Sequence, residues 1–429
     1  MNERRTQAPA TQSPAAPADS PAGAAVCTAC ALACTDVRAG VCERGDEAIR
    51  LRRAGVAVPR AAWIDGAPAD AVGAITAAAV RRRAARRVLV TGRGGVTVEE
   101  AQLACEVAEA LGAAVAAAGP AIDAADPAAL ARTGAVTAAW EELRDRADLV
   151  LFWFHDPTPA LPRFAARFVA PPLPSGRPRS IMAVGAAPAG LVGISHRHAL
   201  DLPADAAVTL ARVLEARLLD RPVGTLTEGL AAAAEGILAA IARADCVGIV
   251  TGDDPSGAGH LAVTGLLRAL APRLPAFEVP AVDGPANAAG AEAVLGWRYG
   301  ASGDVPRATA ATLASDPASP APFDAAVAFR RGAFDAVLAL GAGVGAAAAC
   351  EASAPDVGVV AIDPGAGPFL SRGVHLRCRD LADSSGTIVR ADGTTLALSG
   401  GDATGSTPSV GDILRRLIAA LGVAAGGTR

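Results

Sequence analysis

The segment RVLVTGRGGVTVEEAQLACEVAEALG, residues 87–112, sets the expected fold of this chain. Residues 87–91 form a short apolar run typical of a buried strand, and the glycines of residues 92–95 follow it directly. The sequence TVEE at residues 97–100 is a capping box, which predicts a helix that ends near Leu111. A strand, a glycine turn and a helix in this order are the repeating unit of doubly wound α/β folds.

The same unit recurs along the chain. Further buried strands are predicted at residues 148–154, 180–184, 246–251, 336–340 and 357–363. Near the C-terminus, Asp392-Gly393 separates two β-prone runs, which predicts a hairpin, and an amphipathic helix is predicted at residues 410–421. We therefore expect an α/β protein with several parallel sheets.

Composition shifts divide the 429 residues into four parts. We expect a disordered tail (1–25), a small Cys-bearing N-terminal lobe (26–65), an α/β region of one or more domains (66–245) and a second α/β domain that ends in the hairpin and helix (246–429).

Charge and hydropathy exclude several classes of function. The net charge of -4 does not favour binding to nucleic acid or to an anionic membrane. The 39 basic residues are all Arg, which excludes a P-loop lysine and Schiff-base chemistry. Arg4-Arg5 is not followed by an apolar segment, and there is no uninterrupted apolar run of about 18 residues. These features indicate a cytoplasmic protein.

Four cysteines are clustered in the spacing Cys27-x2-Cys30-x3-Cys34-x7-Cys42. Four soft thiolates on a short loop suit a tetrahedral zinc ion or a cubane iron–sulfur cluster, and the spacing alone does not separate the two. The alternative is a set of unrelated buried cysteines, but clustered thiols in a cytoplasmic protein favour metal binding. The other four are interpreted as small buried apolar residues: Cys105, Cys246, Cys350 and Cys378.

Glycine-rich turns at Gly92–Gly95, Gly252–Gly259 and Gly341–Gly345 could cradle phosphate at helix N-termini. None is a G-x-G-x-x-G or P-loop motif, so tight backbone packing is the preferred interpretation. Asp253-Asp254 with His260 could serve acid–base or metal chemistry, although a structural polar loop is preferred there too. No catalytic constellation is recognised, so no catalytic residue is assigned and the residues of any cofactor site stay undefined.

Residues 146–157, RADLVLFWFHDP, resemble the motif R-A-D-V-V-x-F-W-G-x-N-P of the B subunit of formylmethanofuran dehydrogenase, a member of the molybdopterin oxidoreductase group. Pro162-Arg163 and Arg167 match the continuation of this motif, with Leu161 in place of a His. Further segments resemble the family in the same order: Cys27 to Cys42, Gly92 to Gly112, Asn287 to Trp297, Ile362-Asp363-Pro364 and Gly386 to Gly393. The resemblance covers nearly everything after residue 25, and it implies parallel sheets of the molybdopterin-oxidoreductase type.

Departures from the family pattern bear on activity. The family has a C-H-G-P motif that supplies a Cys ligand to tungsten or molybdenum and a catalytic His, whereas this chain has Ala117-Ala118-Gly119-Pro120. An Arg-Gly of the family is Asp283-Gly284 here, which replaces a positive charge by a negative one. The fourth cysteine of the loop is also closer than in the family. Since alanine cannot ligate a metal, the resemblance implies a retained fold without the redox chemistry.

This combination is similar to the B-type component of the bacterial formyltransferase/hydrolase complex. The resemblance implies a non-catalytic subunit whose partners are a formyltransferase, an amidohydrolase-type subunit and a third structural subunit. Those partners would pass a formyl group from tetrahydromethanopterin to a methanofuran-like carrier and release formate. It also implies a [4Fe-4S] cluster at Cys27, Cys30, Cys34 and Cys42 in preference to zinc, and no molybdopterin with Mo or W.

Two alternatives remain open at this point. One is an active B-type subunit of a tungsten- or molybdenum-pterin formylmethanofuran dehydrogenase. The other is a stand-alone iron–sulfur or zinc binding module. Metal analysis and co-purification of partner subunits would separate them from the first interpretation.

Overall fold

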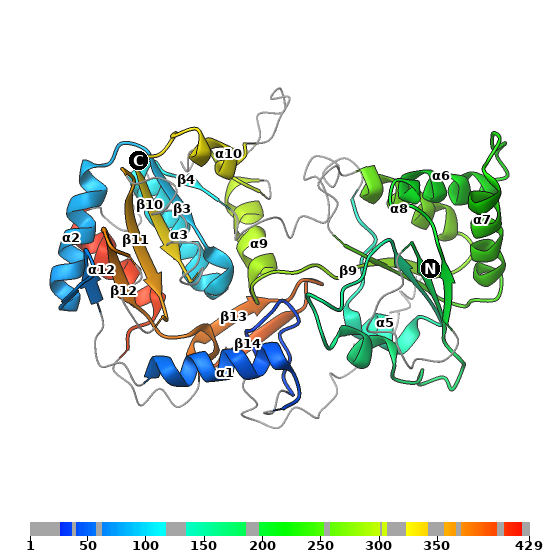
Figure 1. Ribbon diagram of the computed structural model, residues 1–429, viewed down its shortest axis with the longest axis horizontal. Helices are drawn as coiled ribbons and strands as arrows, with labels where there is room; N and C mark the ends of the chain where they lie inside the picture. Colours follow the sequence, from blue (N-terminus) through cyan, green and yellow to red (C-terminus); the bar gives the residue numbers. More distant parts are fainter. Residues whose placement is uncertain are drawn as a thin grey trace, which may run out of the picture.

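Two β-sheets of mainly parallel strands, each covered by helices, form the two lobes that Figure 1 shows. The computed structural model describes residues 26–36, 40–56, 62–116, 134–185, 197–252, 258–300, 303–306, 323–341, 356–365, 370–400 and 407–422. The tail predicted at residues 1–25 lies outside them. The expectation of an α/β protein with parallel sheets is confirmed.

The larger sheet has seven strands in the order β2-β1-β12-β11-β10-β3-β4. They are β1 (Ala62–Ile64), β2 (Ala67–Ala69), β3 (Val88–Thr91), β4 (Ala114–Val115), β10 (Ala336–Leu340), β11 (Gly358–Asp363) and β12 (Gly373–Arg377). Strands β12 to β4 are parallel, and β1 adds an antiparallel edge to β12. Thus β10 lies at the centre of the sheet, between β11 and β3.

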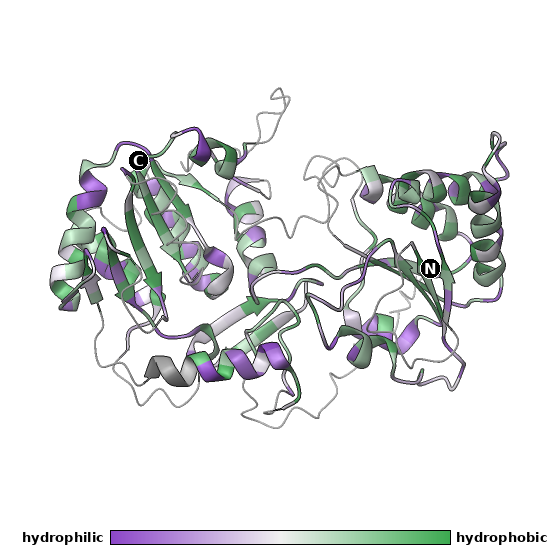
Figure 2. Cartoon of the chain, viewed as in Figure 1, coloured by the Kyte–Doolittle hydropathy of each residue, from purple (hydrophilic) through white to green (hydrophobic). Residues whose placement is uncertain are grey.

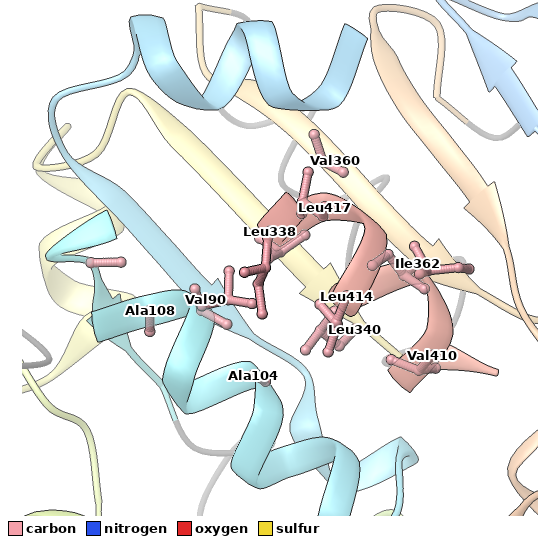
Figure 3. Packing of buried hydrophobic residues seen from close by; sticks show 14 of the residues in the cluster. Val90, Ala104, Ala108, Leu338, Leu340, Val360, Ile362, Val410, Leu414 and Leu417 are labelled. Carbon is pink, nitrogen blue, oxygen red and sulfur yellow. The ribbon is translucent and has the colours of Figure 1, made fainter. Parts of the chain in front are cut away.

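Helices α2 (Ala71–Ala84), α3 (Val98–Leu111) and α12 (Val410–Leu421) contribute to one buried cluster with this sheet. Figure 3 shows Leu414 and Leu417 of α12 against the strand residues Leu338, Val360 and Ile362. Helix α9 (Ala288–Tyr299) packs against α3, and α10 (Ala325–Arg330) contributes Ala325 to the opposite face. The apolar residues of α12 lie on one face of the helix, and this face packs on the sheet.

The smaller sheet has five parallel strands in the order β7-β6-β5-β8-β9. They are β5 (Leu149–Trp153), β6 (Ser180–Val184), β7 (Arg197–Leu200), β8 (Val247–Thr251) and β9 (Ala276–Pro280). Helices α6 (Ala206–Leu218), α7 (Glu228–Ile241) and α8 (Ala258–Leu270) cover one face. Helix α5 (Trp140–Arg146) and a short π-helix (Ala165–Val169) cover the other. Figure 2 shows the apolar strands inside and the polar residues on the outer helix surfaces.

The sheets divide the chain differently from the ranges expected above. Strands β7 and β8, on either side of residue 245, belong to the same sheet. Residues 62–115 and 336–377 share the other sheet, so one α/β unit is inserted into the other. Parallel pairing between distant strands, such as β3 with β10, produces this arrangement.

The predicted hairpin is present as β13 (Ser385–Val389) and β14 (Thr395–Ser399), which form a two-stranded sheet of their own. It lies between the two lobes in Figure 1, beside helix α1 (Glu43–Val56). The turn at Gly393 has a φ of 85°, a left-handed conformation that glycine adopts readily. Among the described residues, no helix is long and apolar enough to cross a membrane.

Candidate functional site

The cysteine loop, residues 26–36, precedes α1 and is closed by backbone hydrogen bonds. The Cys27 N–H donates to the Cys34 carbonyl at 2.8 Å, and the Ala33 N–H donates to the Cys30 carbonyl at 3.2 Å. Ala33 has a φ of 44°, a left-handed conformation that tightens the turn. Cys42 lies immediately before α1, and all four thiols of the predicted metal site are free.

Burial and the neighbouring thiols raise the pKa of two of these cysteines. Burial raises the pKa of Cys30 to about 11, and burial likewise raises the pKa of Cys27. Cys34 and Cys42 raise the pKa of Cys27 further. Among the described residues, no group of three or more His, Cys, Asp or Glu side chains is placed so that it could hold a metal ion. Backbone hydrogen bonds bring Cys27 close to Cys34 and Cys30 close to Ala33, and metal binding by the four cysteines stays a prediction.

The aromatic strand β5 ends at the switch point of the five-stranded sheet. Strands β6 and β8 flank it, and in open parallel sheets a ligand crevice opens beyond the strand ends at such a place. Phe154, the next residue, has a φ of 51°, which is unusual for a bulky side chain. A Cβ at Gly185 would lie 2.6 Å from Phe154 Cδ1, so the phenyl ring lies directly against this glycine.

His155 covers the other side of the same switch point. Its Nε2 donates to the Ala281 carbonyl at 2.7 Å, just beyond β9. A Cβ at Gly252, just beyond β8, would lie 2.3 Å from His155 Nδ1. The two side chains that follow β5 thus lie across the ends of β6, β8 and β9, where a ligand would enter.

A buried polar network lies under α8. Thr251 Oγ1 donates to Glu278 Oε1 at 2.8 Å, and His260 Nδ1 lies 3.3 Å from Glu278 Oε2. Glu278 is 2% exposed and His260 is 5% exposed. Pairing compensates the cost of burying these groups. Asp253 and Asp254, which sequence reasoning placed with His260, lie outside the described residues. The lone carboxylate within AFEVP, residues 276–280, was the signal that could have identified Glu278.

The glycine turns of the seven-stranded sheet pack against each other. A Cβ at Gly95 would lie 2.0 Å from the Gly341 carbonyl oxygen, and a Cβ at Gly341 would lie 2.6 Å from that of Gly95. Arg93 lies in the turn that follows β3 and is fully buried. It donates to the carbonyls of Ala116 (3.0 Å) and Ala291 (3.4 Å). Close backbone packing therefore accounts for these two glycines.

Three of the motifs that carry the family resemblance meet at Asn287. Its Nδ2 donates to the Val96 carbonyl at 2.6 Å, and its Oδ1 accepts from the Val389 N–H of the hairpin at 2.7 Å. Its backbone N–H donates to the Gly94 carbonyl at 3.0 Å. Asn287 is fully buried, so these bonds join the glycine turn, the start of α9 and the hairpin. Their role in this chain is architectural.

The hairpin tip contacts the other lobe through Arg390. The side chain is 4% exposed, and its guanidinium carbon lies 4.8 Å from the Trp140 ring centroid. It donates to Glu141 Oε1 at 2.9 Å and to Asp392 Oδ1 at 2.8 Å, and Asp392 in turn accepts the Trp140 N–H at 2.8 Å. Burial alone would lower the pKa of Arg390, but Asp392 and Glu141 raise it above the ordinary value. Sequence reasoning did not identify Glu141.

The departures from the family pattern can be located in part. Asp283 forms an ion pair with Arg44 at 3.3 Å, and both side chains are partly exposed. Arg44 also donates to the Ala160 carbonyl. Ala117 to Pro120, which would replace the C-H-G-P motif, lie outside the described residues.

These features define a class: a two-lobed α/β protein built of two doubly wound parallel sheets and a separate bridging hairpin. No family model matches the sequence, and no curated protein matches it. In fold, the chain is similar to a chain of the X-ray structure of the formyltransferase/hydrolase complex (FhcABCD) from Methylorubrum extorquens in complex with methylofuran. The TM-score is 0.64 at 22% identity, over 84% of this chain and 98% of that chain. At this identity the likeness establishes the fold.

Proposed function

We propose that this chain is the B-type subunit of a formyltransferase/hydrolase complex in tetrahydromethanopterin- and methanofuran-linked one-carbon metabolism, and that it has no catalytic activity of its own. The likeness in fold to a chain of such a complex, over 98% of that chain, supports the assignment. The order of the family motifs along the sequence supports it independently. In this proposal, the formyltransferase, amidohydrolase-type and third structural subunits are its partners, and the fold is of the molybdopterin-oxidoreductase type.

One observation carries the non-catalytic role: the switch point of the five-stranded sheet is filled by the chain's own side chains. The family motif has a glycine at the position of Phe154 and an asparagine at that of Asp156. A glycine there leaves the strand end open, whereas the Phe154 ring packs on Gly185 and His155 packs on Gly252. In this proposal, Phe154 and His155 occupy the strand ends at which a cofactor would bind.

We propose that Cys27, Cys30, Cys34 and Cys42 hold a [4Fe-4S] cluster, with zinc as the alternative. The donor set suits this cluster, because all four thiols are free and four cysteine thiolates are the ligands of a cubane cluster. Its role in this proposal is structural.

We predict that the native complex contains about four iron atoms per copy of this chain. Cys30→Ser is expected to remove most of that iron, whereas Cys246→Ser, in the same buried cluster but far along the chain, is the matched control and should retain it. Elemental analysis of the purified complex is the measurement. Zinc at about one per chain would favour the zinc alternative. Stoichiometric tungsten or molybdenum would contradict the non-catalytic assignment.

We further predict that the isolated chain neither oxidises formylmethanofuran nor reduces carbon dioxide. Deleting it should abolish formyl transfer and hydrolysis only through loss of complex assembly, which size-exclusion chromatography of the remaining subunits would reveal. Cys105 is the other cysteine near the region of the lost ligand, but it is fully buried in α3. If Cys105→Ala abolished a pterin-dependent activity, the active-enzyme alternative would be correct.

A further inference from the structure

The cysteine loop sends its side chains into two different hydrophobic clusters. Cys30, Leu32 and Cys34 belong to the cluster beneath the five-stranded sheet, together with Trp140, Phe164 and Phe168. Val26 and Ala33 belong instead to a cluster with Ala286 and the hairpin residues Ile388 and Leu398. A loop of eleven residues, 26–36, therefore packs both on the core of the five-stranded sheet and on the hairpin cluster, and the hairpin in turn contacts α3 and α9 of the larger lobe.

Charged contacts reinforce the side that faces the five-stranded sheet. Asp36 accepts two hydrogen bonds from Arg163, at 2.9 and 2.7 Å, and lies 3.4 Å from Arg167. From α1, Arg44 reaches both the Ala160 carbonyl and Asp283. The two arginines that hold Asp36 precede or lie within the π-helix segment, so the loop is fixed to it by both packing and charge.

We propose that the cysteine loop is a staple between the two α/β lobes, and that loosening it lets them open at their junction. The closed backbone of the loop makes this possible, because the Cys27–Cys34 and Ala33–Cys30 hydrogen bonds hold the two groups of side chains in a fixed relation. The hairpin tip is the second contact across the same junction. A change that moves the thiols of the loop therefore also changes how the loop holds the two lobes together.

The Trp140 amide reports the opening, because it donates across the junction to Asp392 Oδ2 at 2.8 Å. Leu32 is 1% exposed. Leu32→Ala removes the largest apolar side chain of the loop from the cluster that also contains Trp140. By hydrogen–deuterium exchange, this change should speed exchange at Trp140 about tenfold, while strand amides of β5 and β8 keep their rates.

Leu218→Ala is the matched control, because Leu218 is buried in the cluster on the opposite face of the same sheet. It should speed exchange within the sheet and leave Trp140 comparatively protected. Asp36→Asn should change Trp140 in the same direction as Leu32→Ala by a smaller factor, without touching a thiol or the metal content.

The staple would be overturned if Leu32→Ala left Trp140 exchange unchanged, or raised it only in proportion to the strand amides. It rests on packing and not on the proposed function. Absence of metal from the purified chain would therefore contradict the cluster and leave the Trp140 result to decide on the staple.

Discussion

Replacing Arg390 by alanine is expected to lower the free energy of unfolding by about 3–5 kcal/mol, because it leaves a buried carboxylate without its cation. The Asp392 side chain is fully buried in the ion pair, and the Arg390 guanidinium also covers the Trp140 ring. Urea denaturation of the isolated chain, followed by circular dichroism, measures the effect. Since the tip joins two lobes, we also expect the variant to unfold less cooperatively.

Arg415→Ala is the control for charge removal. Arg415 pairs with Asp412 at 3.2 Å, but its side chain is 67% exposed, so the expected loss is within about 0.5 kcal/mol. Equal losses for the two variants would show that the buried tip contributes no more than a surface ion pair. Arg390→Lys separates charge from geometry, because lysine keeps the charge and loses the two-pronged contact.

Gly95→Ala is expected to destabilise the seven-stranded sheet by about 3 kcal/mol, the upper end of the range for overpacking. The added methyl group would lie 2.0 Å from the Gly341 carbonyl oxygen. The obstacle is backbone, so no rotamer change relieves it, and the turns after β3 and β10 must separate. Thermal unfolding monitored by circular dichroism is the measurement.

The matched control is Gly236→Ala. Gly236 lies within α7, and a Cβ there would meet nothing within 4 Å. Because alanine is the better helix former, this variant should gain about 0.5–1 kcal/mol. A neutral Gly95→Ala would mean that the two turns are not packed as described.

Local sequence signals predicted the elements well, because they depend on short-range chemistry. The capping box at Thr97 forms as expected, and the Asp-Gly turn closes the hairpin. Pairing between distant strands carries no such local signal, which is why the sheet shared by β7 and β8 was not foreseen.

In the candidate site, too, contacts between distant segments could not be predicted from local sequence. The clustered cysteines were evident from spacing, whereas the contact between His260 and Glu278 depends on how α8 crosses β9.

The family motifs illustrate a different limit. Sequence reasoning used Asn287 only as a marker of resemblance, yet its side chain bonds two distant segments. Phe154 was likewise interpreted only as part of an aromatic strand. Its left-handed backbone and its contact with Gly185 depend on the neighbouring strand β6, which no local pattern encodes.

The insertion of one sheet into the other has a consequence for synthesis on the ribosome. The five-stranded sheet is complete in sequence by Pro280, so it can fold while the rest of the chain is still being made. The seven-stranded sheet cannot close then, because its central strand β10 begins only at Ala336. During that interval β3 has an unpaired apolar edge, exposed to aggregation or to capture by a chaperone. The nascent chain is therefore expected to be most prone to aggregation after the five-stranded sheet has folded and before β10 completes the seven-stranded sheet.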